Sequence, residues 1–269
     1  SLYDALYGTD MISESEGAIR EGGYNPIRGD RVIAFAKNFL DETFPLENGT
    51  FNKATNFEFI DSEIVVTLVD GSKTHLLNKD QYIGYMDKGE GAYGLLFKNN
   101  NLHIEIQVDR SHPIGQDDLA GIKDILVESA ITTIQDCEDS VAAVDDEDKI
   151  IVYRNWLGLM KGNLEASIEK SGKKFIRKLN SDRNYISKDG KNLTLHGRAL
   201  LLNRNVGHLM TSPAILLKDG SEIPEGIMDA FITTAAAIHD FKNKYNSRKN
   251  SFYIVKPKMH GPEEVTLAV

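Results

Sequence analysis

Three carboxylates follow a short apolar run near the middle of the chain. The run from Ile131 to Ile134 is rich in β-branched residues and predicts a buried strand, after which come Asp136, Glu138 and Asp139. Clustered carboxylates repel one another, so they are kept where a cation, a water network or a catalytic task requires them. Parallel α/β folds build active sites at such strand ends. The alternative interpretation is an acidic, solvated loop.

Two further apolar runs, 198–204 and 252–255, also predict buried strands with polar side chains at their ends. These side chains are Arg204, Asn205, His208, Lys256, Lys258 and His260. If the strands are parallel neighbours, Arg204 and Asp139 should lie at the same end of one sheet. An Arg fork binds carboxylates, and a divalent metal polarises carbonyls, so the residues indicate metal-assisted carbonyl chemistry on a small acid. For Lys256, Lys258 and His260, which follow the run 252–255, a structural role fits as well as a role in a site.

Helix and strand patterns alternate after Pro113, which predicts a parallel sheet covered by helices. Helices are expected from Asp117 through Ser129, from about Asp145 to Met160, from Pro224 to about Phe241, and after Gly261. The third helix should turn an apolar face inward, formed by Ile227, Phe231, Thr234, Ala235 and Ile238. An open doubly wound sheet and a closed barrel both fit this pattern.

The region before Pro113 has a different rhythm. Asp30 can cap a helix whose apolar face includes Val32 and Leu40, and residues 51–108 then alternate with a period of two. Hairpins are predicted over 63–77, over 95–108 and, much later, around 185–195, and we expect the last to join the earlier ones in one antiparallel unit. The histidines of this region, which are His75, His103 and His112, are scattered and predict no metal site.

Composition narrows the class of protein. The chain has 269 residues, 41% of them hydrophobic and 26% charged, as is ordinary for a globular protein with a sizeable core. Its net charge of −9 argues against nucleic acid and anionic membranes as partners. The lone cysteine, Cys137, allows no internal disulfide, which suits a cytoplasmic location, and its acidic neighbours favour a packed thiol over a nucleophile. The longest apolar helix pattern, between Asp229 and Asp240, is too short to span a bilayer.

Several segments resemble malate synthases of the G isoform, in the same order along the chain. They are SLYDALYGTD at 1–10, DCEDSVAAVD at 136–145, YRNWLGLMKG at 153–162, LHGR at 195–198, RNVGHLM at 204–210 and VKPKMHGP at 255–262. The resemblance implies a partial (β/α)8 TIM barrel with an inserted α/β domain rich in antiparallel hairpins. The barrel would use residues 1–28, 131–162 and 198–269, and the inserted domain would use 29–130 and 163–197.

The resemblance also implies a reaction and its residues. Malate synthase is an acyltransferase of the glyoxylate bypass of the tricarboxylic acid cycle; it condenses acetyl-CoA with glyoxylate and hydrolyses the thioester, giving malate and CoA. By resemblance Arg204 is the catalytic arginine, which assists enolisation and binds glyoxylate. Ser140 and Arg177 match acetyl-CoA contacts. Glu138 and Asp139 would hold the water bound to Mg²⁺ rather than the ion itself.

By the same resemblance the chain is a fragment of a longer enzyme. The family's two direct magnesium carboxylates and its catalytic aspartate correspond to positions after Val269, so the chain holds no direct metal ligand. An Arg-Trp pair that contacts acetyl-CoA and an N-terminal helical segment would precede Ser1. We therefore expect the isolated chain to be inactive, and its unpaired strand edges to favour self-association. The longer enzyme is expected to be monomeric.

Two other functions fit parts of the sequence. A carbon-carbon lyase of the citrate-lyase β-subunit type also places an acid motif after a barrel strand, although the predicted hairpins and the segment around Arg204 speak against it. A non-catalytic α/β interaction module is the second alternative, because the hairpin-rich domain could fold independently.

Overall fold

The computed structural model describes residues 1–128, 131–138, 143–170 and 172–269. Contacts divide the chain into two compact units, Ser1–Ser129 with Arg183–Leu195, and Ala130–Asp182 with His196–Val269. Both units combine helices with strands, so the fold class is mixed α/β. The predicted domain limits assign 1–28 and 163–182 differently from this division, and those limits stay a proposal.

The first unit contains a six-stranded antiparallel sheet in the order β12-β11-β4-β5-β6-β7 and a three-stranded sheet in the order β1-β2-β3. Its elements are α1 (Leu2–Gly8), η1 (Ser15–Gly17), α2 (Pro26–Thr43), η2 (Phe51–Lys53), β1 (Ala54–Ile60), β2 (Glu63–Leu68), β3 (Lys73–His75), η3 (Lys79–Gln81), β4 (Tyr82–Gly89), β5 (Ala92–Asn99), β6 (Leu102–Val108), α3 (Pro113–Asp117), β7 (Ile122–Val127), β11 (Arg183–Ser187) and β12 (Asn192–Leu195).

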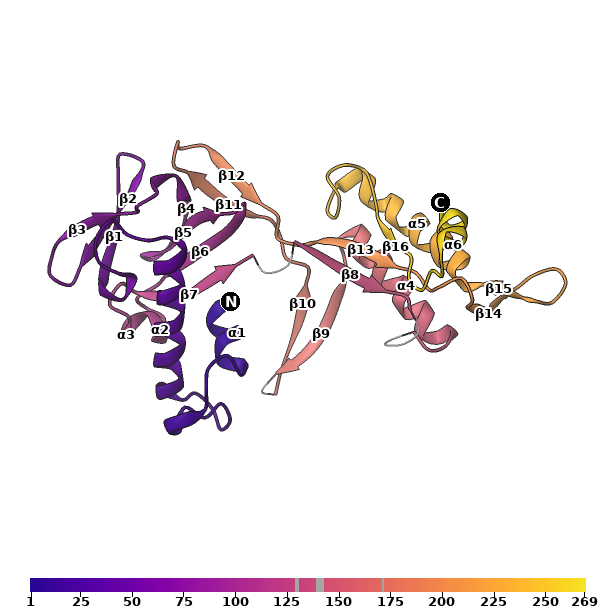
Figure 1. Ribbon diagram of the computed structural model, residues 1–269, viewed down its shortest axis with the longest axis horizontal. Coiled ribbons are helices and arrows are strands. Elements are labelled where there is room, and N and C mark those ends of the chain that lie inside the picture. Colours follow the sequence, from indigo (N-terminus) through magenta and orange to yellow (C-terminus); the bar gives the residue numbers. More distant parts are fainter. Residues whose placement is uncertain (129–130, 139–142, 171) are drawn as a thin grey trace. The chain divides into compact units, whose positions relative to one another are not determined.

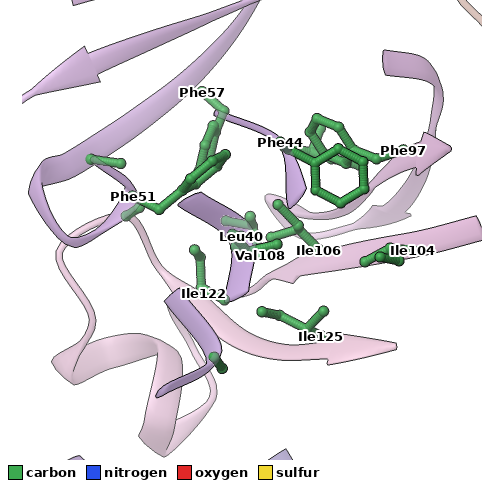
Figure 2. Packing of buried hydrophobic residues seen from close by; sticks show 14 of the residues in the cluster. Leu40, Phe44, Phe51, Phe57, Phe97, Ile104, Ile106, Val108, Ile122 and Ile125 are labelled. Atoms are coloured by element: carbon green, nitrogen blue, oxygen red, sulfur yellow. The ribbon is translucent and has the colours of Figure 1, made fainter. Parts of the chain in front are cut away.

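Helix α2 lies beside β5, β6 and β7 and packs an apolar face against them (Figure 1). Figure 2 shows Leu40 and Phe44 of this helix among the side chains of Phe97, Ile104 and Ile106 from the sheet. The helix begins earlier than its pattern predicts. The Asn25 side chain, not that of Asp30, accepts the first backbone hydrogen bonds, and Pro26 occupies the first turn, where no backbone N–H is needed.

The predicted hairpins are confirmed. Strand β2 pairs with β3 and β5 with β6, both antiparallel. The late hairpin β11–β12 belongs to the same sheet, because Ile186 lies opposite Tyr85 and Ser187 opposite Gly84 of β4. Gly84 permits this close approach, since a Cβ there would lie 2.4 Å from the carbonyl oxygen of Ile186. Segments about a hundred residues apart in the sequence therefore form one antiparallel sheet.

The helix predicted from Asp117 through Ser129 is wrong. Residues Pro113–Asp117 form the short helix α3, and Ile122–Val127 form strand β7, which pairs with β6. The Asp118 side chain accepts hydrogen bonds from the amides of Ala120 and Ile122 and, with Gly121 at a φ of 78°, turns the chain into the strand. Spacing alone suited a helix, but pairing with β6 buries the same isoleucines more effectively.

A buried carboxylate attaches β11 to the sheet. Glu105 on β6 is buried, and it accepts hydrogen bonds from Tyr185 of β11, from Lys88 at 2.6 Å and from Gln107 at 2.9 Å. Arg183 lies 3.5 Å away at the start of β11. Burial raises the pKa of Glu105, but the hydrogen bonds from its neighbours together lower it by more. The pKa of Glu105 therefore lies below its ordinary value. The carboxylate therefore stays ionised and well satisfied inside the sheet.

Replacing Tyr185 by Phe should loosen β11 by removing one hydrogen bond to a buried charge, a contact worth about 1.5–3 kcal/mol. The Lys188 amide donates to the carbonyl of Ile83 in β4 at 3.0 Å, so native-state hydrogen exchange of this amide measures the loss as reduced protection. Tyr24→Phe is the matched control, because Tyr24 is exposed in the same unit. Equal protection in the two variants would show that Glu105 does not attach this strand.

The second unit is built around a three-stranded parallel sheet in the order β16-β13-β8 (Figure 1). Its elements are β8 (Thr132–Asp136), α4 (Asp146–Lys161), β9 (Glu165–Lys170), β10 (Lys173–Lys178), β13 (Leu200–Arg204), β14 (Thr211–Leu216), β15 (Glu222–Pro224), α5 (Glu225–Asn243), β16 (Ile254–Val255) and α6 (Pro262–Ala268). The predicted strands and helices of this region are present. The described residues do not form a closed barrel, so the partial barrel is not confirmed.

Three expectations about burial in this unit are wrong. The strand predicted at 252–255 is not buried, because Tyr253 and Ile254 are exposed. Strand β8 is not buried, because Ile134 keeps 50% of its surface exposed at the edge of the sheet. Helix α5 buries the face opposite to the predicted one. Phe231 is 75% exposed, whereas Asp229 and Asp240 are buried. The amides of Asn246 and Ser247 donate to Asp240, so hydrogen-bonded carboxylates share the inner face with the apolar residues Met228, Ala236 and Ala237.

Among the described helices, none is both long enough and apolar enough to cross a membrane.

Candidate active site

The ends of β8 and β13 bring an arginine and two carboxylates together. Arg204 lies opposite Asp136 in the parallel pairing of β13 with β8 and opposite Val255 in the pairing with β16. Its Nε donates to Asp136 Oδ1 at 2.8 Å, and its Nη2 donates to Oδ2 of the same carboxylate. The same Nη2 lies 3.7 Å from Glu138 Oε2. The prediction that polar groups converge at one sheet edge is confirmed for these residues.

A second cation completes the cluster from the strand next to β13. Lys258, three residues after β16, contacts the Glu138 carboxylate through its Nζ. Glu138 is only 2% exposed, so its charge needs such partners. Lys258 adopts a φ of 55°, which is uncommon for a residue with a side chain. Lys258 thus belongs with the site, whereas His260 is exposed and pairs with Glu264 at the start of α6.

The charges of the cluster keep Asp136 ionised. The hydrogen bond from Arg204 is the main reason that the pKa of Asp136 lies below its ordinary value; burial opposes this shift, and the amide of Glu138, donating at 3.0 Å, supports it. The same hydrogen bond raises the pKa of Arg204. The resemblance to malate synthases assigns a role to Glu138 and Asp139 but none to Asp136. Its position directly opposite Arg204 follows only from the strand register.

The described residues do not make a complete magnesium site. No three His, Cys, Asp or Glu side chains converge in the described parts of the chain. Asp136 and Glu138 both face cations, which already compensate their charge. The side-chain oxygen of Asn205 is buried and has no hydrogen-bond partner among the described residues, but one amide oxygen does not form a coordination shell.

Comparison with known proteins places the chain in a family. Residues 24–99 match the family described as malate synthase G, alpha-beta insertion domain, and residues 200–269 match malate synthase, TIM barrel domain. The chain is 54% identical over 271 residues to a malate synthase G of Halalkalibacterium halodurans, in an alignment covering 100% of this chain and 37% of that protein. The chain belongs to the malate synthase G family.

Two further relatives agree. Malate synthase G proteins of Corynebacterium efficiens and Corynebacterium glutamicum are 53% and 51% identical over 268 residues, which cover 98% of this chain and 36% of each relative. The chain thus spans little more than a third of the length of these malate synthase G proteins. The family match agrees with the resemblance on which the assignment of site residues was based.

The residues assigned by that resemblance are found in different places. Arg204 lies in the cluster at the sheet edge, and Glu138 lies beside it. Asp139 and Ser140 fall outside the described residues. Arg177 lies exposed on β10, which pairs only with β9 among the described strands, and no described hydrogen bond or ion pair joins it to Arg204. Lys256 donates to the carbonyl of Val206 at 2.6 Å, so it holds the backbone after Arg204.

Cys137 is a packed thiol, as its surroundings predicted. It is fully buried, and its Sγ lies 3.5 Å from Asn203 Oδ1 on β13. Burial raises its pKa to about 12, so almost no thiolate is present at neutral pH. The residue therefore contributes packing behind the site rather than chemistry in it.

Replacing Arg204 by Met should raise the pKa of Asp136 toward the ordinary value for Asp, because the main cause of the shift is removed. In the unmodified chain the ion pair is intact at any pH above the ordinary pKa of Asp. It is lost only as the pH falls through the lowered pKa of Asp136. Carboxyl-carbon NMR titration measures both values. Asp219 is the control, because Ser221 lowers its pKa and it should not respond. An unchanged Asp136 would contradict the pairing.

The thiol of Cys137 should react slowly with a disulfide reagent at pH 8 in the folded chain and rapidly after denaturation. Since Cys137 is the chain's only cysteine, the absorbance of the coloured thiolate that the reagent releases reports the reaction of this residue alone. Reaction at the same rate before and after denaturation would show that the thiol is accessible in the folded chain. It would contradict the burial of Cys137 behind the site.

Proposed function

We propose that the longer protein containing this chain is a malate synthase, which condenses acetyl-CoA with glyoxylate and hydrolyses the thioester to malate and CoA. The observation that carries this proposal is the identity of 54% over the whole chain with a malate synthase G. The cluster at the ends of β8, β13 and β16 supports it, because a cation held between carboxylates suits a small anionic substrate.

Arg204 is the residue proposed to act on glyoxylate. Asp136 engages its Nε and Nη2, which orients the guanidinium plane. Among the described contacts, Nη1 makes no hydrogen bond, so its two N–H groups remain available to a carboxylate or to a developing enolate oxygen. An arginine whose Nε and Nη2 are hydrogen-bonded to a carboxylate keeps a fixed orientation while its Nη1 binds the substrate.

The remaining assignments follow from family membership. Ser140 and Arg177 are proposed to contact acetyl-CoA, whose phosphates make an exposed arginine a suitable partner. Glu138 and Asp139 are proposed to accept hydrogen bonds from water around Mg²⁺, whose direct ligands would be other residues of the longer protein. Glu138, the one of the two that the structure describes, is consistent with this indirect role, since it is already paired with Lys258.

The architecture and setting of the longer protein are also proposals. The parallel sheet β16-β13-β8 with α4 and α5 is proposed to be part of a (β/α)8 barrel, and the hairpin-rich unit to be its insertion domain. We expect a cytoplasmic, monomeric enzyme that uses neither nucleic acid nor membrane. The isolated chain is expected to make no malate and to self-associate through exposed strand edges.

The two alternatives receive less support. A citrate-lyase-like carbon-carbon lyase would not account for the match of residues 24–99 to an insertion domain of malate synthase G. An interaction module would not need an arginine fork between carboxylates, although it remains the competing function for the isolated chain.

The proposal is tested by thiol release from acetyl-CoA in the presence of glyoxylate and Mg²⁺, using the longer protein. Arg204→Lys should lower kcat by about 10²- to 10³-fold, as expected when a preorganised donor to a developing oxyanion is displaced. Lys242→Met, an exposed change on α5, should leave turnover unchanged. The isolated 269-residue chain should be inactive under the same conditions.

Citryl-CoA is the comparison substrate. Cleavage of citryl-CoA without malate formation would favour the lyase, and no turnover of either substrate by the folded longer protein would favour the interaction module. Full activity of Arg204→Lys would remove Arg204 from the proposed chemistry.

A further inference from the structure

A buried ion network lies behind the site, between α4 and α5. Lys149 of α4 is almost fully buried, and its Nζ lies 2.5 Å from Glu225 Oε1 and 3.3 Å from Asp229 Oδ1, both on α5. The third partner of this ammonium is the carbonyl oxygen of Cys137, at 2.6 Å. Cys137 stands between Asp136 and Glu138, so Lys149 holds the backbone that carries both carboxylates of the site.

Asp229 makes the matching contact with the other strand end. Its Oδ2 accepts the backbone N–H of Val206 at 3.0 Å, and its Oδ1 accepts the hydroxyl of Tyr153 at 2.6 Å. Val206 follows Arg204 by two residues, and its own carbonyl accepts from Lys256 at 2.6 Å. The backbone after Arg204 is therefore held on both sides by buried side chains.

The position of α5 depends on a glycine at its second residue. A Cβ at Gly226 would lie 2.3 Å from Lys256 Nζ, 3.0 Å from the carbonyl oxygen of Val206 and 3.3 Å from that of Gly207. A side chain at this position would displace the Lys256 ammonium and crowd the backbone that follows Arg204. The start of the helix is thus packed closely on the strand end, with the Lys256 ammonium beside the contact.

Stability alone does not explain such a network. Taking charged groups out of water costs several kcal/mol per ion, and apolar replacements of buried ion pairs are often neutral or stabilising. What a buried ion pair can supply is a unique geometry. Here the geometry concerns two backbone segments, one bearing Asp136 and Glu138 and the other bearing Arg204.

We propose that Lys149 and Asp229 are positioning residues, which hold the ends of β8 and β13 so that the Arg204 guanidinium meets the Asp136 carboxylate in a fork and keeps its free edge toward the substrate. The inference rests on the proposed malate synthase function for its kinetic consequence. Its structural part, the alignment of Arg204 with Asp136, concerns the described chain alone.

The first test measures the pKa of Asp136 by NMR in the 269-residue chain carrying Asp229→Asn. If Asp229 only contributed charge, its neutralisation would lower or leave unchanged the pKa of Asp136, because a negative neighbour is removed. If it positions Arg204, the pKa of Asp136 should instead rise toward its ordinary value as the fork loosens. The two roles thus predict shifts of opposite sign.

The second test uses the longer protein and a double-mutant cycle. Asp229→Asn should lower kcat/KM for glyoxylate by about 100-fold, the loss expected from a misplacement near 1 Å, with the KM for acetyl-CoA little changed. In an Arg204→Lys background the same change should cost far less, because the residue acts through Arg204. Tyr153→Phe, which removes one hydrogen bond to Asp229 and no charge, should show the same pattern more weakly and guards against a folding defect.

Lys242→Met on α5 is the control and should change neither measurement. A rise in the pKa of Asp136 together with non-additive losses supports the inference. The inference is overturned if the pKa of Asp136 falls or stays constant. It is also overturned if the loss of kcat/KM in the double variant equals the product of the two single losses within about twofold. If the unmodified longer protein makes no malate, the proposed function fails, and the sign of the pKa shift still decides whether Asp229 positions Arg204.

Discussion

The parallel pairing of β13 with β8 is the constraint on which the candidate site depends. Parallel strands bring equivalent ends to one edge of a sheet, and the observed register sets Arg204 directly opposite Asp136. A slip of one residue would turn either side chain to the other face and separate the guanidinium from its carboxylate. The ion pair, the approach of Glu138 and the contact from Lys258 all follow from this alignment.

Buried carboxylates recur as the means of joining segments that are distant in sequence. Glu105 ties β11 to the sheet of the first unit through Tyr185 and Lys88, and Asp229 ties α5 to the backbone after β13. Each carboxylate accepts several hydrogen bonds, so its burial leaves no unsatisfied charge. Since such contacts need defined geometry, they specify where a segment sits more strictly than apolar packing of similar area does.

Sequence similarity and geometry support the proposed reaction in different ways. Identity above 50% to three malate synthase G proteins indicates which reaction to consider, while the chain spans only 36–37% of their length. The geometry indicates how one residue of that reaction would work. Asp136 holds one edge of Arg204, and the other edge is left for an anion. The described residues of the site provide too few oxygen donors to hold a metal ion by themselves.

The sequence by itself determined the hairpins, the helices with clear caps, and the convergence of Arg204 with carboxylates at strand ends, because turn residues, caps and strand periods are local signals. Tertiary structure alone decided three matters. It made 122–127 a strand, because pairing with β6 outweighed a helical spacing. It turned a face of α5 that includes Asp229 inward, because Lys149, Tyr153 and the Val206 amide satisfy this carboxylate. It selected Asp136 as the partner of Arg204, because register depends on contacts between strands, and no local pattern records them.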